Sequence, residues 1–465
     1  MKLRRIMFAA PKSGSGKTII TCALLQALKN KGQQVIAYKC GPDYIDPMFH
    51  EQVIGVPSKN LDTFFTDEIV TKDIFLKERT ESDFAILEGV MGIFDGLGGV
   101  REEGSSYHLA KVTKTPIILV IDAKGMGRSI LPLIAGFLAY DTQQLIRGVI
   151  LNRMSKGYYE IIKPLIEEEL NIQVVGYFPE QKEVRIESRH LGLMMPGEIA
   201  DIKEQLSFLA EMITKTISAE QIVEIAESAE ELDIKTADVL ETKKVEAEQG
   251  PVIAVAKDEA FCFYYTDNLK MLEEMGAKLQ YFSPLHDETL PEKCHALLLG
   301  GGYPELYAES LSKNISMRNA VSEAIKEGMP VVAECGGFMY LHSAITDKDG
   351  KTYKMTDVVK GTCSYKGKLV RFGYIEVEEK VNHFLKKGGK IRGHEFHYFD
   401  STANGEDCIA SKPVSGKTYL CIIAEENKWM GFPHLYYPSN PEFAKVFVEK
   451  ARKYKLKSEN GNRII

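Results

Sequence analysis

The residues near the start of the chain constrain the fold most, because a glycine-rich segment there separates a predicted strand from a predicted helix. An apolar run at 6–10 precedes the sequence KSGSGKT, and an amphipathic stretch at 17–31 follows it. Glycines let backbone N–H groups surround phosphate oxygens, the lysine reaches the β and γ phosphates, and the hydroxyl can hold magnesium. We therefore predict a nucleotide site made by Lys12, Ser13, Gly14, Ser15, Gly16, Lys17 and Thr18.

The loop departs from the strict phosphate-loop motif at one position. Pro11 stands where that motif has its first glycine. A structural glycine turn is therefore the alternative interpretation, although a strand–loop–helix context favours nucleotide binding.

Short β-branched runs alternate with longer amphipathic stretches through most of the chain, which predicts parallel sheets covered on both faces by helices. In the first half the expected strands are 6–10, 34–39, 84–87, 116–121 and 148–152, with helices at 17–31 and 158–170. The second half repeats the pattern with strands at 252–256, 296–299 and 330–333, and helices near 268–275 and 316–327. Short strands and turns are expected after these.

A change of composition divides the chain. Residues 198–250 are rich in Glu, Lys, Ala and Ile, and we interpret them as a solvated helical connector that runs into a charged linker. The expected organisation is a phosphate-loop domain at 1–197, this connector, a second α/β domain at 251–445 and a C-terminal tail at 446–465.

Acidic residues follow two of the predicted strands, where an open parallel sheet presents its loops to ligands. Glu88 ends one strand in the position of a magnesium-binding acid, and Asp43 and Asp95 lie in the loops GPDYIDP and EGVMGIFDG. Thr18, Glu88 and Asp43 are the candidate metal ligands. The alternative is that Asp43 and Asp95 only cap turns. Asn152, at the end of the fifth strand, is placed to hydrogen-bond an adenine edge.

A second candidate site contains a thiol. The sequence AECGG, residues 333–337, joins a predicted strand to a predicted helix as a nucleophile elbow around Cys335. A position at a helix N-terminus should lower the pKa of this thiol. The glycine loop at 300–302 and the N–H of the residue after the nucleophile predict an oxyanion hole at Gly301 and Gly336. The alternative is an inert core thiol.

The thiol needs a base, and His434 is the leading candidate. His394 and His397 compete for this role. These two residues do not have the i, i+4 spacing of a zinc-binding helix, so they are expected to be structural or to face the substrate.

Composition narrows the class of protein. The 465 residues carry 58 basic and 65 acidic side chains, a net charge of -7, which gives no support for nucleic-acid binding. The eight cysteines form no CxxC pair, which is typical of a reducing cytosol. No signal peptide or run of about 20 apolar residues is present, so we expect a cytoplasmic protein without a membrane partner.

Together the motifs resemble the cobyrinic acid a,c-diamide synthases of the cobalamin-pathway glutamine amidotransferase family. The resemblance covers nearly the whole chain, and the segments that carry it are 39–47, 60–62, 88–96, 300–305, 334–337, 392–397 and 434–440. It implies a dethiobiotin-synthetase-like, P-loop NTPase-like first domain. The second domain would be a class I glutamine amidotransferase, which is flavodoxin-like.

The resemblance also implies a mechanism. Cys335 would attack the glutamine amide to form a thioester, with His434 as its proton partner. The ammonia would react with a tetrapyrrole carboxylate that ATP and Mg²⁺ have activated as an acyl phosphate, on the c and then the a side chain. Asp43, Tyr44 and Ile45 would lie near the tetrapyrrole, and Glu88 and Asp95 would serve magnesium and the reacting carboxylate. A homodimer is the candidate assembly.

Two alternatives stay open. Lys12 resembles the extra lysine of MinD/ParA-like regulatory ATPases, and nickel-sirohydrochlorin presents acetate side chains similar to those of cobyrinic acid. One departure concerns the base, because ordinary class I glutaminases have a glutamate two residues after the histidine, where this chain has Tyr436.

Overall fold

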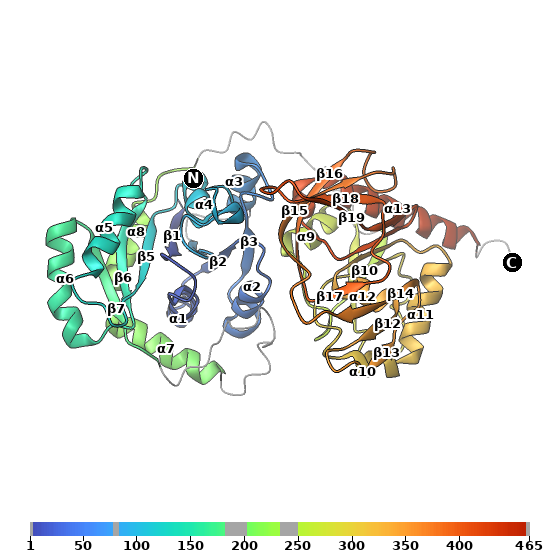
Figure 1. Cartoon of the computed structure of the whole chain (residues 1–465), viewed down its shortest axis with the longest axis horizontal. Coiled ribbons are helices and arrows are strands. Elements are labelled where there is room, and N and C mark those ends of the chain that lie inside the picture. Colours follow the sequence, from blue (N-terminus) through green and yellow to red (C-terminus); the bar gives the residue numbers. More distant parts are fainter. Residues whose placement is uncertain (1–2, 78–82, 182–201, 233–249, 462–465) are drawn as a thin grey trace. The chain divides into compact units, whose positions relative to one another are not determined.

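The chain is seen in a computed structural model that describes residues 3–77, 83–181, 202–232 and 250–461. It divides into two compact units, Met1–Val239 and Leu240–Ile465 (Figure 1). The limit between them, and the limit expected at 197, both lie outside the described residues. Each unit has a sheet of its own and is described by itself.

A seven-stranded sheet forms the centre of the first unit, in the order β3-β2-β4-β1-β5-β6-β7. Every neighbouring pair in it is parallel. The strands are β1 (Arg4–Ala9), β2 (Val35–Cys40), β3 (Ser58–Leu61), β4 (Phe84–Glu88), β5 (Ile117–Asp122), β6 (Ile146–Asn152) and β7 (Gln173–Phe178). Nearly continuous apolar strands of this kind are typical of a parallel sheet buried on both faces. The predicted fold class of this half is confirmed.

Helices connect these strands, and two further helices follow the last strand of the sheet (Figure 1). They are α1 (Lys17–Asn30), α2 (Ile45–Phe49), α3 (Glu68–Leu76), α4 (Ser106–Val112), α5 (Ile130–Tyr140), α6 (Lys156–Leu170), α7 (Ile202–Thr216) and α8 (Ala219–Glu227), with short turns of π-helix at His50–Ile54 and 3-10 helix at Leu97–Gly99. The α7 helix packs against α1, and α8 packs against β1.

The helices α7 and α8 are therefore not the solvated connector that the sequence predicted. Leu206 and Leu209 of α7 are buried, as are Ile222 and Ile225 of α8, and all four belong to the core of the first unit. Their charged residues occupy the outer face, so a high content of Glu and Lys did not reveal the buried apolar face. The part of the expected connector at 233–249 lies outside the described residues.

The second unit is built on a sheet with the order β20-β21-β11-β10-β8-β9. Its strands are β8 (Val252–Ala256), β9 (Lys278–Phe282), β10 (Ala296–Leu299), β11 (Val331–Glu334), β20 (Ile423–Glu425) and β21 (Lys428–Gly431). Five of them are parallel and follow the flavodoxin-like order 2-1-3-4-5, whereas β20 is an antiparallel edge. The flavodoxin-like prediction is confirmed.

Two smaller sheets complete the second unit, in agreement with the short strands expected there. Their strands are β12 (His342–Thr346), β13 (Thr352–Lys354), β14 (Val359–Tyr365), β15 (Arg371–Glu379), β16 (Lys390–His397), β17 (Phe399–Ser401), β18 (Cys408–Ser411), β19 (Thr418–Cys421) and β22 (His434–Leu435). The helices are α9 (Thr266–Glu274), α10 (Ala308–Lys313), α11 (Ile315–Lys326), α12 (Gly336–Leu341) and α13 (Pro441–Gly461), with a 3-10 turn at Tyr437–Ser439.

The last helix, α13, occupies most of the segment that we expected to be a tail. Phe443, Phe447 and Ala451 lie one turn apart and are fully buried in the core of the second unit. The charged residues between them dominate the composition and hide this apolar stripe.

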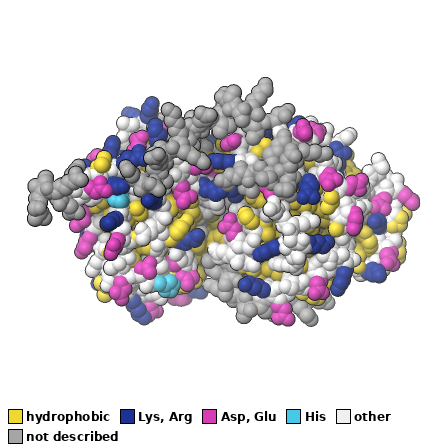
Figure 2. Space-filling model, turned by 180° about the vertical axis from the view of Figure 1, so that it is seen from behind, with side chains coloured by type: hydrophobic (Ala, Val, Ile, Leu, Met, Phe, Trp, Pro, Cys, Tyr) yellow, Lys and Arg dark blue, Asp and Glu magenta, His cyan; other side chains and the backbone are white. Residues whose placement is uncertain are grey.

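Charges of both signs are interspersed over the face of the molecule that Figure 2 shows. This mixture fits the small net charge of -7. Among the described residues, no helix combines the length and the apolar character needed to cross a bilayer.

The position of α13 generates a test of stability. Phe447→Ala should lower the free energy of unfolding of the second unit by about 3–5 kcal/mol, because it opens a cavity under a fully buried ring. Leu456→Ala on the same helix is the control, because that side chain is 54% exposed and its loss should cost at most about 0.5 kcal/mol. Denaturant unfolding measures the free energy of unfolding of both variants. If Phe447→Ala and Leu456→Ala lowered it equally, α13 would not pack as described.

Candidate active sites

The phosphate loop of the first unit has a backbone that only glycine suits. Gly14 and Gly16 have φ angles of 75° and 98°, in the left-handed region that glycine adopts without strain. A Cβ on Gly16 would lie 2.1 Å from Nδ2 of Asn152. That amide donates to the carbonyl of Ser15 at 2.8 Å, and the Ser15 hydroxyl donates to the carbonyl of Lys12 at 2.9 Å. Asn152 thus supports the loop itself.

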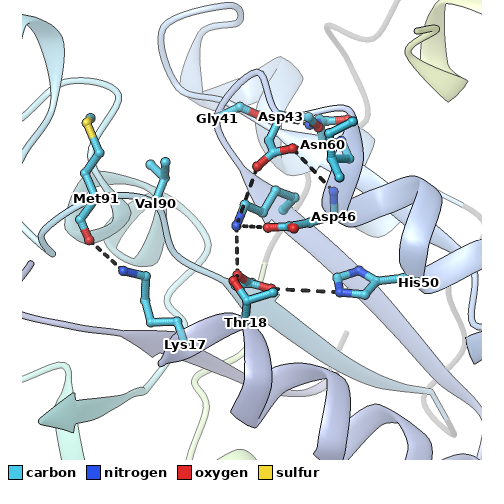
Figure 3. Close-up of polar contacts among 12 residues, drawn as sticks. Lys17, Thr18, Gly41, Asp43, Asp46, His50, Asn60, Val90 and Met91 are labelled. Atoms are coloured by element: carbon cyan, nitrogen blue, oxygen red, sulfur yellow. Dashed lines mark hydrogen bonds and ion pairs between the residues drawn. The ribbon is translucent and has the colours of Figure 1, made fainter. Parts of the chain in front are cut away.

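The residues after the loop enter the first turn of α1 and reach the ends of neighbouring strands. The Thr18 hydroxyl donates to Oε1 of Glu88 at 2.5 Å, and the Lys17 ammonium donates to the carbonyl of Met91 at 2.7 Å (Figure 3). Burial, followed by repulsion from the Lys39 ammonium, lowers the pKa of Lys17 to about 8. Lys12 and Ser13 stay exposed at the open side of the loop. The loop, Thr18 and Glu88 thus lie together, as the sequence predicted for a nucleotide site.

Next to the phosphate loop, a buried lysine forms ion pairs with three carboxylates. Nζ of Lys39, at the end of β2, lies 2.8 Å from Oε1 of Glu88 and 3.9 Å from Oδ2 of Asp43, and it forms an ion pair with Asp46. The labelled Asp43, Asp46 and His50 of this group lie close together in Figure 3. His50 also belongs to this group, because its Nε2 lies 3.8 Å from Oε2 of Glu88.

The acids shift the proton affinities in this cluster. Burial alone would lower the pKa of Lys39, but the three carboxylates hold it well above its ordinary value. Burial also raises the pKa of Glu88 to about 7, although Lys39 opposes this change. The pKa of Asp43 rises to about 6, through burial and then through the negative charge of Asp46. Such carboxylates would ionise fully on meeting a further cation.

The other residues predicted to contact the substrate lie in the loop of Asp43, beside this cluster, and in the loop of Asp95. Oδ1 of Asp43 accepts from the N–H groups of Ile45 and Asp46, at 2.8 and 3.3 Å, so Asp43 caps its turn and also reaches Lys39. Tyr44 is buried and Ile45 is half-buried. Asp95 is exposed, and its Oδ2 accepts from the N–H of Gly92 at 2.9 Å.

Sequence reasoning missed Lys39, Asp46 and His50 as members of the site. Lys39 and Asp46 stand inside the conspicuous segment 39–47, so their position could have indicated a role. His50 gave no such signal. Among the described residues, no group of His, Cys, Asp and Glu side chains is arranged by itself as a metal centre. The fit to magnesium therefore depends on Thr18 and the carboxylates that now surround Lys39.

In the second unit, Cys335 occupies a strained turn between β11 and α12. Its φ and ψ are 46° and -101°, a conformation that is unfavourable for a residue with a side chain. The N–H of Cys335 donates to the carbonyl of Gly431 at 2.8 Å. A Cβ on Gly337 would lie 2.1 Å from the carbonyl oxygen of Leu299, so the turn needs glycine there. This is the geometry of a nucleophile elbow.

The glycine loop after β10 brings His434 and the elbow together. A Cβ on Gly301 would lie 2.3 Å from Cε1 of His434, and a Cβ on Gly336 would lie 3.0 Å from the backbone nitrogen of Gly302. Both predicted oxyanion residues therefore lie in one small region with the imidazole. This placement favours His434 over its two competitors as the base.

The competing histidines have other partners. Nδ1 of His394 lies 3.0 Å from the hydroxyl of Tyr265, and its ring stacks on His434 with centroids 4.9 Å apart. Nδ1 of His397 lies 2.6 Å from the carbonyl of Phe399. Both residues are on strand β16 rather than on a helix.

Burial keeps the thiol and the imidazole neutral. It raises the pKa of Cys335 above the ordinary value, with the charge of Glu305 as the next cause, and the N–H of Gly336 offsets only part of this rise. It lowers the pKa of His434 to about 3. The expectation that the helix N-terminus lowers the thiol pKa is therefore wrong, because the cost of burying a charge exceeds the effect of one short helix.

Comparisons with known proteins agree with both halves of this description. Residues 6–193 match the model of the CobQ/CobB/MinD/ParA nucleotide binding domain, and residues 252–431 match that of the CobB/CobQ-like glutamine amidotransferase domain. The predicted pairing of these two domains, and with it the predicted fold class, is confirmed.

Whole-length relatives give the family. A protein of Caldanaerobacter subterraneus subsp. tengcongensis named cobyrinate a,c-diamide synthase is 40% identical over 97% of this chain and 99% of its own length. Proteins of the same name from Listeria innocua and Thermoplasma volcanium are each 38% identical, over 94% and 99% of this chain and 97% and 100% of their own. The chain therefore belongs to the cobyrinate a,c-diamide synthase family of glutamine amidotransferases.

Proposed function

We propose that this chain is a ligase that uses ATP and glutamine to convert the a and c acetate carboxylates of cobyrinic acid into amides. The observation that carries the proposal is the strained Cys335 turn in a chain whose phosphate loop also brings Thr18 against Glu88. A thiol of this kind releases nitrogen from an amide, and a nucleotide site activates the acid that receives it. The names of the whole-length relatives support the choice of acceptor.

In the glutaminase step we assign the nucleophile to Cys335 and the base to His434. Sulfur attacks the side-chain carbonyl of glutamine while His434 accepts the thiol proton, and the N–H groups of Gly301 and Gly336 stabilise the oxyanion. His434 then returns the proton to the leaving ammonia, which leaves a thioester on Cys335. Water, deprotonated by His434, hydrolyses the thioester and releases glutamate.

In the synthetase step we assign ATP to the phosphate loop, with Lys17 at its β and γ phosphates and Asn152 toward the adenine. Magnesium, held by Thr18, Glu88 and Asp43, would neutralise phosphate charge during transfer. The γ-phosphate moves to the carboxylate of the acceptor, which makes a good leaving group. Ammonia then attacks the acyl phosphate and releases phosphate.

The acceptor would lie beside the loop 43–45. We assign Asp43, Tyr44 and Ile45 to contacts with the tetrapyrrole, and Glu88 and Asp95 to the metal and the reacting carboxylate. Glu88 is fully buried, so its charge acts in a region of low dielectric. The proposal includes a cytoplasmic location and, as candidate assembly, a homodimer.

The alternative of a MinD/ParA-like regulatory ATPase is not favoured. It shares the nucleotide-binding domain, but it leaves the glutamine amidotransferase domain at 252–431 without a role. Nickel-sirohydrochlorin is not favoured as acceptor either, because the relatives described above are named for cobyrinate.

The first test separates the two sites by their nitrogen source. Cys335→Ser should abolish glutamine hydrolysis and glutamine-dependent synthesis, whereas synthesis from ammonium salt should persist, because the phosphate-loop site is unchanged. Cys294→Ser, at another buried thiol of the second unit, is the control and should keep both activities. Undiminished glutamine consumption by Cys335→Ser would contradict the proposal.

The second test removes an acid at the phosphate-loop site. Glu88→Gln should lower synthesis from both glutamine and ammonium by about 100-fold or more, because a charge that acts on the transferred phosphate is lost. Basal glutamine hydrolysis should remain. Glu169→Gln, which replaces a surface acid paired with Arg128, should change neither rate. Normal synthesis by Glu88→Gln would remove this residue from the proposed mechanism.

The third test concerns the protonation of the thiol. Burial raises the pKa of Cys335 above its ordinary value of 9.0, so the reactive thiolate should form only in strongly alkaline solution. Alkylation of Cys335 by iodoacetamide, followed by peptide mass spectrometry, should therefore accelerate with rising pH without a plateau below pH 9.0. A plateau near neutral pH would indicate a preformed thiolate–imidazolium pair instead.

A further inference from the structure

We infer that Glu334, the residue before the nucleophile, is a positioning residue that orients His434 and stabilises its cationic form during glutamine hydrolysis. The inference deepens the glutaminase half of the proposed function and rests on it. Glu334 would not touch glutamine; its ionised form acts through the imidazole.

The contacts of the Glu334 carboxylate carry the inference. Its Oε2 lies 3.9 Å from Nδ1 of His434, and its Oε1 accepts from the N–H of Leu435 at 3.3 Å. One oxygen therefore holds the backbone next to the histidine, while the other faces Nδ1 of the imidazole. Catalytic contacts of this length often shorten when substrate binds.

Both side chains are fixed by regular structure. Glu334 ends β11, where it pairs in register with Gly431 of β21. His434 begins β22 and pairs with His394 of β16. The side chains of Glu334 and His434 are only 8% and 3% exposed, so neither can exchange its partner for water. A carboxylate that precedes the nucleophile by one residue is thus held rigidly against the base.

The electrostatics give this contact a function. Burial raises the pKa of Glu334 to about 8 and lowers that of His434 to about 3, so each charged form is costly alone. When Cys335 passes its proton to the imidazole, a cation forms beside the carboxylate, and in a low-dielectric interior the two charges stabilise each other. The neighbouring His394 and His397 are basic and cannot supply this negative charge.

Tyr436 does not take this role. It stands two residues after the histidine, but its hydroxyl donates to Oδ2 of Asp267 on α9 at 3.0 Å. A phenol donates a hydrogen bond readily but carries no negative charge at neutral pH. The carboxylate that contacts the imidazole comes from β11 instead.

The test compares two replacements of Glu334 that differ in charge and size. Glu334→Gln keeps the volume and the acceptor for the Leu435 N–H but loses the negative charge. Glu334→Asp keeps the charge on a shorter side chain. A role in stabilising the imidazolium predicts that activity falls in the order Glu, Asp, Gln, whereas a role in packing predicts that the Gln variant outperforms the Asp variant.

The expected result for Glu334→Gln is a fall of about 100-fold in kcat for glutamine hydrolysis, with the KM for glutamine almost unchanged. Synthesis from ammonium salt should stay at the wild-type rate. Glu379→Gln is the matched control, because this buried carboxylate of the same unit accepts only backbone N–H groups of 383–385 in the contacts described. It should lower the free energy of unfolding without changing kcat.

A wild-type kcat in Glu334→Gln, or lower activity in Glu334→Asp than in Glu334→Gln, would overturn the inference and leave the proposed function intact. If the Gln variant does not fold, the Asp variant alone decides. A rise in its KM for glutamine without a fall in kcat would also overturn the inference. Absence of glutamine hydrolysis in the unmodified chain would overturn the proposed function as well.

Discussion

Both sites depend on one constraint, which is that a strand of a parallel sheet must turn into a helix within a few residues. At such a turn backbone N–H groups face outward at the carboxyl edge of the sheet, where ligands bind. In the first unit the constraint requires a positive φ at Gly16, and in the second it strains Cys335. The same backbone geometry thus serves a phosphate in one unit and, in our proposal, an oxyanion in the other.

The two sites differ in the charge of their buried groups: those of the first unit form ion pairs, whereas those of the second are neutral. In the first unit the buried ammonium of Lys39 collects the carboxylates of Glu88, Asp43 and Asp46, so a dense charge network is ready to respond to a nucleotide and its metal. In the second unit burial keeps Cys335 and His434 neutral until the thiol gives up its proton. The first arrangement suits the transfer of a charged phosphate, and the second protects a thiol from reaction before glutamine is in place.

The local sequence was sufficient to predict the two loops, but it was not sufficient to predict which distant residues contact them. The phosphate loop and the elbow at Cys335 could be predicted because each needs particular residues at fixed spacing. Contacts across the fold could not be predicted. Glu334 meets His434, about a hundred residues later in the chain, because the last residue of β11 contacts β22. The stripe of α13 was missed because its charged residues outnumber those, such as Phe447, that the core buries.

The central claim is that one chain releases nitrogen from glutamine and places it on a carboxylate of cobyrinic acid. The most direct measurement is mass spectrometry of cobyrinic acid, and in parallel of nickel-sirohydrochlorin, after incubation with ATP, magnesium and amide-¹⁵N-labelled glutamine. The account predicts a doubly labelled diamide of cobyrinic acid, with glutamate and ADP formed in equal amounts. Unlabelled cobyrinic acid together with continued ATP hydrolysis would contradict it.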